Sequence, residues 1–251
     1  MQMLIKTIKL SAFLILFYAI SLFCEKETAG FSIRRISAAP TLPFTNQGET
    51  LATQEILKQP FHYLARGGQT FVFVSEDQKY VLKFFKNSPN AFVPLKKYHT
   101  KKIGKLMRDI EGYLLAFERL PEESGLIFLK LDTETPFDQT VTIVDKLGIQ
   151  HELSLQKTLF VVQKKGEPLN SYLAHSNDVQ SVFDALGHLM EIRRSHAIDD
   201  TDSHLAQNLG FIDGRPCFLD PGKFVNAPIQ NREYPEKFVT WVKINYPEAH
   251  L

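Results

Sequence analysis

The fold is decided by residues 205–222, LAQNLGFIDGRPCFLDPG, near the C-terminal end of the chain. A short apolar run lies on each side of the dipeptide Asp213-Gly214, and this pattern predicts a β-hairpin because both turn residues tolerate positive φ. Such a hairpin would hold Asn208 and Asp220 near each other at its open end. Amide and carboxylate oxygens are ligands suited to a hard cation such as Mg²⁺. The same two residues could also be the polar ends of an ordinary surface hairpin, so the rest of the chain has to decide.

The composition is that of a globular protein with a sizeable core. The chain has 251 residues, of which 44% are hydrophobic and 23% are charged, and this balance excludes a chain that is disordered throughout. A net charge of +1 predicts no affinity of the whole protein for nucleic acid or acidic lipid. The two cysteines, Cys24 and Cys217, are too few for a disulfide framework, and no zinc-type spacing of Cys and His occurs. We expect Cys217 to be a small core residue.

The first 24 residues differ from the rest. Lys6 and Lys9 precede an uncharged apolar run, residues 10–23, which is the pattern of a secretion signal or a signal anchor. The run is shorter than the roughly 20 residues that a spanning helix needs, and the N-terminal lysines favour an N-inside orientation that places the domain across the membrane. A lipoprotein at Cys24 is an alternative, although a bulky residue precedes that cysteine. We therefore expect a membrane-anchored or secreted protein that contacts the membrane through residues 10–23.

The middle of the chain predicts an antiparallel sheet. Residues 25–57 have no sustained period and are expected to be a linker or a poorly ordered arm. From residue 58 to 163 the chain becomes rich in β-branched and aromatic residues, which predicts about five strands and one helix. Gly67 and Gly68 join the first two strands, and a glycine pair lets the backbone come close to a ligand such as a phosphate, although most such pairs only make a turn.

A lysine and an acidic helix stand out in this part. Lys83 lies inside an apolar strand, where it is either on the exposed face of a half-buried strand or a charge that awaits an acid. The predicted helix at 96–119 supplies two such acids, Asp109 and Glu111, beside its apolar stripe. The basic first half of this helix, residues 96–108, is expected to be a solvated face.

The last part, residues 164–251, is expected to be mostly helical. A polar, Gly/Pro-punctuated stretch after residue 163 predicts a hinge between two parts of the chain. A helix ending near Ser195 and another at 234–244, with Pro235 in its first turn, flank the hairpin.

In this order of parts the chain resembles the protein-kinase-like superfamily, over roughly residues 60–225. The resemblance implies an α+β, two-lobed fold. The N-lobe, residues 58–163, would be an antiparallel sheet with one αC-like helix. The C-lobe, residues 164–251, would be reduced and mostly helical. About 30 residues follow Asp220, so we expect the C-lobe to lack the family's usual platform for a peptide substrate.

The resemblance also implies a site for ATP and Mg²⁺. Gly67 and Gly68 would belong to the loop over the nucleotide phosphates, and Lys83 would contact those phosphates. Glu111 would orient Lys83, with Asp109 as its substitute if the helix is rotated.

The remaining roles fall on the hairpin and the loop before it. Asn208 and Asp220 resemble the two metal-binding residues, with Asp220-Pro221-Gly222 in place of Asp-Phe-Gly. The family's catalytic Asp corresponds in position to Ser203, so Asp202, one residue earlier, is the candidate base.

Three functions are compatible with these residues. The first is a membrane-anchored or exported kinase-like phosphotransferase, which binds a nucleotide and an unknown acceptor. The second is a pseudokinase that acts as an interaction scaffold for a protein partner, which Ser203 and the short C-terminal part favour. The third is an exported β-rich binding domain unrelated to kinases. No nucleic-acid partner is expected.

Overall fold

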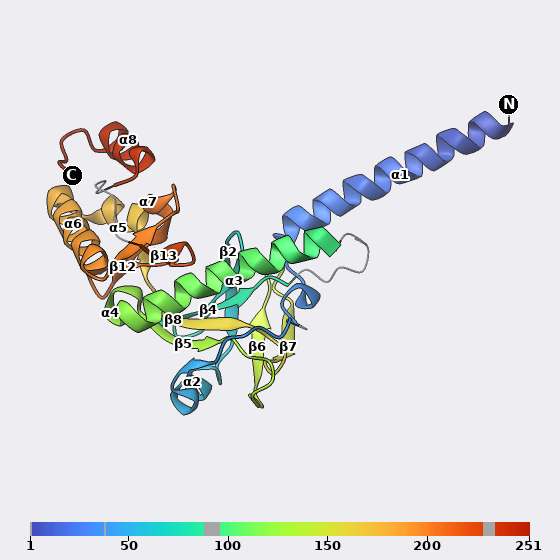
Figure 1. Cartoon of the computed structure of the whole chain (residues 1–251). Coiled ribbons are helices and arrows are strands. Elements are labelled where there is room, and N and C mark those ends of the chain that lie inside the picture. Colours follow the sequence, from blue (N-terminus) through green and yellow to red (C-terminus); the bar gives the residue numbers. More distant parts are fainter. Residues whose placement is uncertain (1, 38, 88–95, 228–233) are drawn as a thin grey trace.

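The computed structural model describes residues 2–37, 39–87, 96–227 and 234–251, and within these it has a mixed α/β architecture. An eight-stranded sheet lies at one end of the molecule, and helices α5 to α8 with two small sheets gather at the other (Figure 1). Helix α3 runs along the large sheet between them, and helix α1 projects away as a rod (Figure 1).

The large sheet curls and is antiparallel with one exception. Its strand order is β1-β5-β8-β4-β3-β2-β6-β7, and only β2 and β6 pair in parallel. The prediction of a mostly antiparallel sheet is therefore confirmed, with more strands than expected. The strands are β1 (Gln47–Gly48), β2 (Phe61–Arg66), β3 (Thr70–Ser75), β4 (Tyr80–Phe85), β5 (Leu126–Lys130), β6 (Thr140–Val144), β7 (Gln150–Ser154) and β8 (Phe160–Lys164).

Residues 25–57, which the composition predicts to be a linker, are built into the fold. They contain the end of α1 (Gln2–Glu27), the 3₁₀ turn η1 (Ile33–Arg35), strand β1 and helix α2 (Thr50–Ile56). Phe31 and Ile36 are buried in the core of the large sheet. The apolar residues of this segment follow no helical or strand period, so only their tertiary contacts reveal that they belong to the core.

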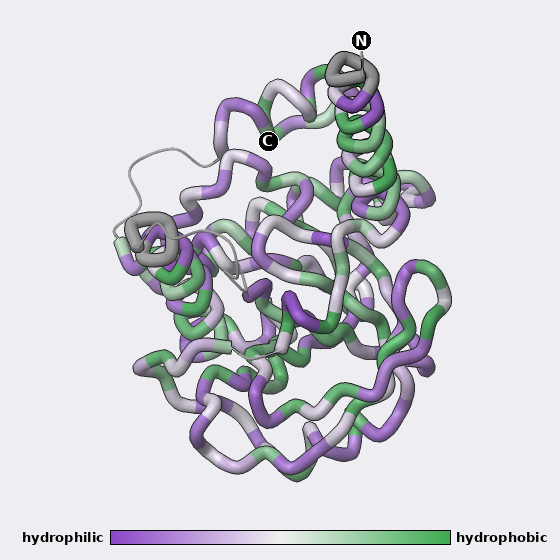
Figure 2. Tube along the Cα trace, turned by 90° about the vertical axis from the view of Figure 1, so that its right-hand side faces the viewer, coloured by the Kyte–Doolittle hydropathy of each residue, from purple (hydrophilic) through white to green (hydrophobic). Residues whose placement is uncertain are grey.

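Helix α1 is apolar along most of its length and makes no core (Figure 2). Its side chains from Lys6 to Cys24 are exposed, and Lys6–Glu27 is a helix long and apolar enough to cross a membrane. The structure thus extends the predicted apolar run by several residues, to a length that can span a bilayer. A secretion signal would have the same length and composition.

The remaining helices are α3 (Lys96–Arg119), α4 (Pro121–Ser124), α5 (Leu169–His175), α6 (Val179–Ser195), α7 (Leu205–Asn208) and α8 (Glu236–Asn245). Helices α5 to α8 form the helical end. Its strands are β9 (Glu167–Pro168), β10 (Ile198–Asp200), β11 (Leu209–Ile212), β12 (Arg215–Phe218) and β13 (Phe224–Asn226). The predicted hairpin is confirmed as β11 and β12, whose turn residues Asp213 and Gly214 have φ of 50° and 75°. Cys217 is buried, as predicted.

The two faces of the large sheet bury different partners. One face carries a cluster of aromatic rings that includes Phe84, and the other face packs against α3, where Phe85 contacts Tyr113 edge-on at 5.6 Å between ring centroids. Because successive side chains of a strand point to opposite faces, Lys83 shares the face of Phe85. The strand period alone therefore turns Lys83 toward α3.

Candidate active site

Lys83 is a buried lysine at the centre of the sheet. Strand β4 lies between β3 and β8, and the Lys83 side chain is 6% exposed. Its Nζ donates a hydrogen bond to the carbonyl oxygen of Leu219, the residue before Asp220. The exposed-face interpretation of Lys83 is therefore wrong, and this lysine connects the large sheet to the end of the hairpin.

Two neighbours surround the Lys83 amine. Burial lowers the pKa of Lys83 and the nearby Asp220 carboxylate acts to raise it. Nζ also lies 5.6 Å from the centroid of the Tyr113 ring, within the range of a cation–π contact. No acidic side chain of α3 forms an ion pair with Lys83 among the described residues, so its charge is balanced from the hairpin.

Asp220 is fixed by α3 and by its own turn. Its Oδ1 accepts hydrogen bonds from the Tyr113 hydroxyl at 2.9 Å and from the Gly222 amide at 3.3 Å. The turn lies against Gly112, where a Cβ would be 2.5 Å from the carbonyl oxygen of Pro221. Gly112 is thus the residue that lets the backbone after Asp220 touch the helix.

Helix α3 presents Asp109 and not Glu111 to this region. Asp109 is 4% exposed and its Oδ1 is 2.8 Å from the Nζ of Lys223, whereas Glu111 is exposed. Positions 109 and 111 are about 200° apart on a helix of 3.6 residues per turn, so only one of them faces a given site. Burial raises the pKa of Asp109, although Lys223 opposes the effect. The assignment of Glu111 as the partner of Lys83 is corrected accordingly, and Asp109 pairs with Lys223 instead.

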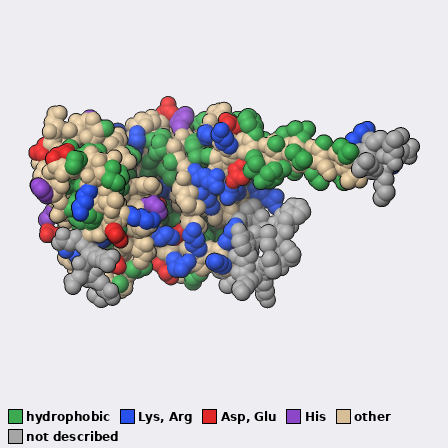
Figure 3. Space-filling model, turned by 90° about the horizontal axis from the view of Figure 1, so that it is seen from above, with side chains coloured by type: hydrophobic (Ala, Val, Ile, Leu, Met, Phe, Trp, Pro, Cys, Tyr) green, Lys and Arg blue, Asp and Glu red, His purple; other side chains and the backbone are tan. Residues whose placement is uncertain are grey.

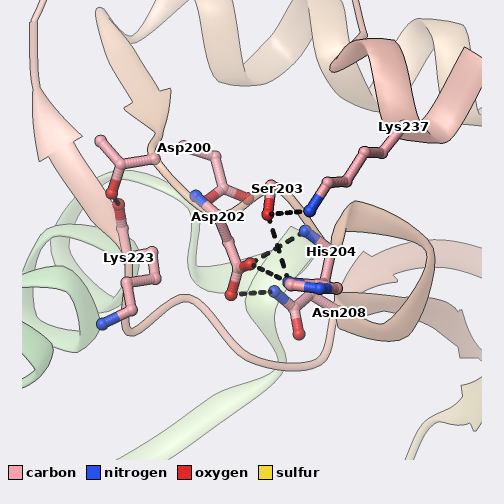
Figure 4. A network of polar contacts seen from close by, with 8 residues as sticks. Asp200, Asp202, Ser203, His204, Asn208, Lys223 and Lys237 are labelled. Atoms are coloured by element: carbon pink, nitrogen blue, oxygen red, sulfur yellow. Dashed lines mark hydrogen bonds and ion pairs between the residues drawn. The ribbon is translucent and has the colours of Figure 1, made fainter.

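The loop before the hairpin is folded around Asp202 (Figure 4). Asp202 Oδ2 accepts a hydrogen bond from Asn208 Nδ2 at 3.1 Å, and Oδ1 accepts one from the His204 amide at 2.9 Å. Burial acts to raise the pKa of Asp202, but the hydrogen bonds from His204 and Asn208 outweigh it and the pKa is lowered. Asp202 is therefore ionised at neutral pH. Ser203 is exposed, and its Oγ lies 3.5 Å from Lys237 Nζ.

Asp200 and Arg193 form a buried ion pair that supports this loop. Asp200 Oδ1 accepts the hydrogen bond of the Asp202 amide at 2.9 Å, and Asp200 Oδ2 is 3.8 Å from Arg193 Nη1 on α6. Burial raises the pKa of Asp200 to about 6, despite Arg193 and the Asp202 amide. The Asp200 carboxylate thus holds the backbone of Asp202 in place.

The glycine pair forms a turn that a lysine holds closed. The Gly67 amide donates to the Thr70 carbonyl oxygen at 3.0 Å. Lys86 Nζ donates to the carbonyl oxygens of Gly67 and, at 3.3 Å, of Gly68. A side chain at Gly68 would meet nothing within 4 Å, so the turn itself does not require glycine at that position.

These elements enclose one small cavity of about 110 Å³. It is lined by the glycine turn, the face of α3, the Asp202 loop and the turn after the hairpin. Its residues are Gly68, Gln69, Thr70, Phe85, Lys105, Asp109, Tyr113, Asp202, Asp220, Gly222 and Lys223. Asn208 is one hydrogen bond away from the cavity, through Asp202. Lys83 lies behind its wall, with Nζ 5.6 Å from the ring centroid of Tyr113. A larger hollow of about 820 Å³ lies between α4, α6 and the hairpin, away from Lys83 and Asp202.

Among the cavity residues that are absent from the sequence-based assignment, three are charged or hydroxyl-bearing residues of α3 and of the turn after the hairpin, namely Tyr113, Lys105 and Lys223. Tyr113 follows Asp109 by four residues and so lies on the same face of the helix. That spacing is the signal that could have identified it. Lys223 follows the metal-binding candidate by three residues, and nothing in the local sequence pairs it with an acid more than 100 positions earlier.

The comparisons with known proteins give a distant structural similarity only. No family model matches the chain, and no curated protein matches it significantly. Solved structures of WbdD are among those similar to this chain. The structure of the bifunctional kinase-methyltransferase WbdD is 15% identical, with a TM-score of 0.41, and the match covers 82% of this chain and 38% of that chain. The structure of monomeric WbdD is 16% identical, with a TM-score of 0.41, and the match covers 83% and 42%. The matches thus span about two fifths of the length of the WbdD chains.

Proposed function

We propose that the chain is a kinase-like phosphotransferase that uses a magnesium-bound nucleotide. The observation that carries the proposal is that Asp202 and Asp220 line the cavity below the glycine turn, while Lys83, from a distant part of the sequence, lies behind it beside Tyr113 and Asp220. Phosphoryl transfer needs a cation for the phosphates, oxygen ligands for Mg²⁺ and a carboxylate that accepts the acceptor's proton. Each of these groups is present, so the chain needs no further residue type for the chemistry.

The oxygen ligands available here suit a Mg²⁺ ion that also binds the nucleotide phosphates better than they suit a metal ion held by protein side chains alone. Asp220 offers one carboxylate and Asn208 an amide oxygen, which points away from Asp202 (Figure 4). Among the described residues, no group of three His, Cys, Asp or Glu side chains is placed to hold a metal ion. Mg²⁺ is usually bound by one or two carboxylates together with substrate phosphates and water. Asn208 and Asp220 would therefore hold an ion that arrives with the nucleotide, and the ion would neutralise charge on the phosphates.

The chain's own residues would prepare the acceptor. Asp202 is ionised and fixed by Asn208 and by the His204 amide, so it can orient a hydroxyl group and accept its proton. Lys83 would neutralise phosphate charge from the sheet side. The cavity of about 110 Å³ is smaller than the roughly 300 Å³ or more of typical ligand pockets, so the glycine turn has to move away before a nucleotide can enter.

A pseudokinase is the second candidate, favoured by a specific observation. No acid of α3 is paired with Lys83, and the lysine instead donates to the Leu219 carbonyl oxygen. A protein that binds nucleotide without turnover needs Lys83 and Asp220 but does not need Asp202 as a base.

The test uses the full-length protein in detergent, because Phe31 and Ile36 belong to the core and a fragment that starts after them would lose packing. We expect Mg-ATP to raise the melting temperature of the wild type. Lys83→Ala should abolish this rise, whereas Lys79→Ala, at an exposed position of the neighbouring turn, should keep it. Absence of a rise in the wild type would contradict both kinase-like functions and leave a binding domain.

Turnover of radiolabelled ATP separates the two candidates. We expect Asp202→Asn to reduce turnover by about 100-fold to 10,000-fold, the usual contribution of a general base, and Ser203→Ala to leave it nearly unchanged. A melting shift without any turnover in the wild type would identify a pseudokinase. Turnover that Ser203→Ala removes and Asp202→Asn spares would exchange the two roles.

A further inference from the structure

Three cations from separate elements meet where α1 joins the domain. Arg35 comes from η1, Arg66 from the end of β2 and Lys86 from just after β4. The Arg35 guanidinium and the Lys86 amine both lie over the ring of Phe71, at 5.7 Å and 4.6 Å from its centroid. We call Arg35, Arg66 and Lys86 the basic cluster.

The two arginines approach each other across Gly30. A Cβ on Gly30 would be 2.8 Å from Nη1 of Arg66 and 3.0 Å from Nη1 of Arg35. Arg35 donates to the carbonyl oxygen of Gly30 at 2.7 Å, and Arg66 donates to that of Ala29 at 3.0 Å. A glycine at this position therefore lets both guanidinium groups share one short stretch of backbone.

The positive charge of the basic cluster is poorly compensated. Among the described residues, the acidic partner of the basic cluster is Glu25, whose Oε1 is 3.7 Å from Arg66 Nη1. Burial, together with the like charges of Arg66, Arg35 and Lys105, lowers the pKa of Lys86 to about 8, because both effects disfavour the protonated form. Arg35 and Arg66 are ordered by hydrogen bonds to carbonyl oxygens just after α1, and Lys86 is ordered by hydrogen bonds to those of the glycine turn. These hydrogen bonds do not explain why three cations share a site with one acid.

The position of the basic cluster relative to α1 points to its ligand. The last turn of α1 is fastened to the domain, since Lys146 Nζ donates to the Lys26 carbonyl oxygen at 3.1 Å and the Gly30 amide donates to that of Glu25 at 2.8 Å. If α1 spans a bilayer, the basic cluster lies at the level of the lipid headgroups. Lys and Arg side chains gather on this face, around the base of the projecting helix (Figure 3). The side chains of residues 96–100, the start of the basic run in α3, lie outside the described part.

We propose that Arg35, Arg66 and Lys86 bind the phosphate groups of anionic lipids in the leaflet where α1 ends. Arg and Lys are the side chains that recognise phosphate, and a basic surface next to a membrane helix is attracted to an anionic leaflet. The inference does not require nucleotide binding, although Lys86 of the basic cluster also donates to the carbonyl oxygens of Gly67 and Gly68 in the glycine turn. It places the domain on the anionic side of the membrane, opposite to the orientation that Lys6 and Lys9 favour. A local cluster thus overrides the prediction from net charge that acidic lipid is not a partner.

The test follows arginine modification by phenylglyoxal in the wild-type protein, reconstituted in nanodiscs. We expect Arg35 and Arg66 to react about fivefold more slowly in phosphatidylserine-containing nanodiscs than in phosphatidylcholine nanodiscs, since each basic residue gains about 1 kcal/mol at an anionic surface. Arg119 and Arg215, on the other end of the molecule, should react equally in both. Salt at about 1 M should remove the protection because it screens surface charge.

A third arm separates lipid phosphate from free phosphate. Inorganic phosphate added to phosphatidylcholine nanodiscs should give little protection. Equal protection by inorganic phosphate would show that a soluble anion is the ligand and would overturn the lipid assignment. Equal protection in both kinds of nanodisc would mean that the bilayer merely covers the arginines, and no protection in any arm would also refute the proposal.

A melting experiment provides a second readout. Wild-type protein should melt at a higher temperature in anionic than in neutral nanodiscs. The double variant Arg35→Gln, Arg66→Gln should lose this difference. The control Lys58→Gln, Lys79→Gln removes the same charge from the turn after α2 and from the β3–β4 turn, and should keep it. Each variant is compared with itself in the two lipids, so a change in intrinsic stability does not affect the result. A difference that the arginine variant retains would contradict the proposal.

Discussion

The hydroxyl group of Tyr113 donates a hydrogen bond of 2.9 Å to Oδ1 of Asp220, so helix α3, which packs on the large sheet, fixes the carboxylate at the end of the hairpin. We expect Tyr113→Phe to weaken Mg-ATP binding by about tenfold, because a hydrogen bond to a charged group contributes about 1.5 kcal/mol or more. The ring, and with it the contact to Lys83, is retained. Titration of the melting temperature with Mg-ATP measures the effect. Tyr80→Phe, on the sheet, is the matched control, and equal affinities for both variants would contradict the role of Tyr113.

Gly112 is required by contact and not by backbone conformation. A Cβ at this position would be 2.5 Å from Pro221 O and 2.9 Å from the Gly222 carbonyl carbon, both backbone atoms that cannot rotate away. We expect Gly112→Ala to destabilise the protein by about 1–3 kcal/mol, as overpacking does, and to reduce nucleotide binding by displacing Asp220. Gly104, on the same helix, has open space around its Cβ position. Gly104→Ala should therefore stabilise the protein slightly, by up to about 1 kcal/mol.

Chemical denaturation of the two variants in detergent measures both effects. Two variants of equal stability would show that α3 and the turn after Asp220 are not in close contact.

Asp200 should give the stability a characteristic pH dependence. Burial raises its pKa from 3.8 to about 6 in the folded state, so between these values the folded protein binds the proton and the unfolded protein releases it. Stability should therefore fall as pH rises from about 4 to 6, by about 1–3 kcal/mol, since one pKa unit corresponds to about 1.4 kcal/mol. Asp200→Asn should remove this fall, and Asp184→Asn, at an exposed position of α6, should not. Chemical denaturation at several pH values in this range measures the free energy of unfolding. The same slope of this free energy against pH in both variants would refute the buried position of Asp200.

Lys130 is a second buried lysine, with no role in the site. Its side chain is 0% exposed, and its Nζ has no hydrogen-bond partner among the described residues. Burial lowers the pKa of Lys130. We expect Lys130→Met to stabilise the protein by about 1–3 kcal/mol, because an unpaired buried polar group costs about that much. Lys164→Met, at an exposed position of β8, should change stability by less than about 0.5 kcal/mol. Loss of stability in Lys130→Met would show that the contact of Nζ with the Phe137 ring, 5.9 Å from its centroid, outweighs the cost of burying the amine.

Local chemistry explains which features could be predicted from the sequence. The hairpin depends on two adjacent residues, Asp213 and Gly214, whose tolerance of positive φ is a property of the residues themselves. For Lys83 the apolar neighbours left two alternatives open, the exposed face of a half-buried strand and a charge that awaits an acid. The two-residue period of the strand gives only the side chains that share its face.

Features that depend on distant contacts could not be predicted. The sequence places Asp109 and Glu111 near the same apolar stripe of α3, and only the packing of Tyr113 and Gly112 against the hairpin fixes the rotation of the helix. The role of residues 25–57 was missed for the same reason. Phe31 and Ile36 reach the core of the sheet through contacts with strands that follow much later in the chain.

The short connection between α1 and the core determines how far the domain can travel. Helix α1 ends at Glu27 and Phe31 is already buried, so three residues join them. Fully extended, such a connection spans only about 10–14 Å, far less than a flexible linker of tens of residues would allow. If α1 spans a bilayer, the Asp202 carboxylate works at a nearly constant height above it. Acceptors that reside in the membrane would then meet the site at a high effective concentration, and acceptors in bulk solution would have no such advantage.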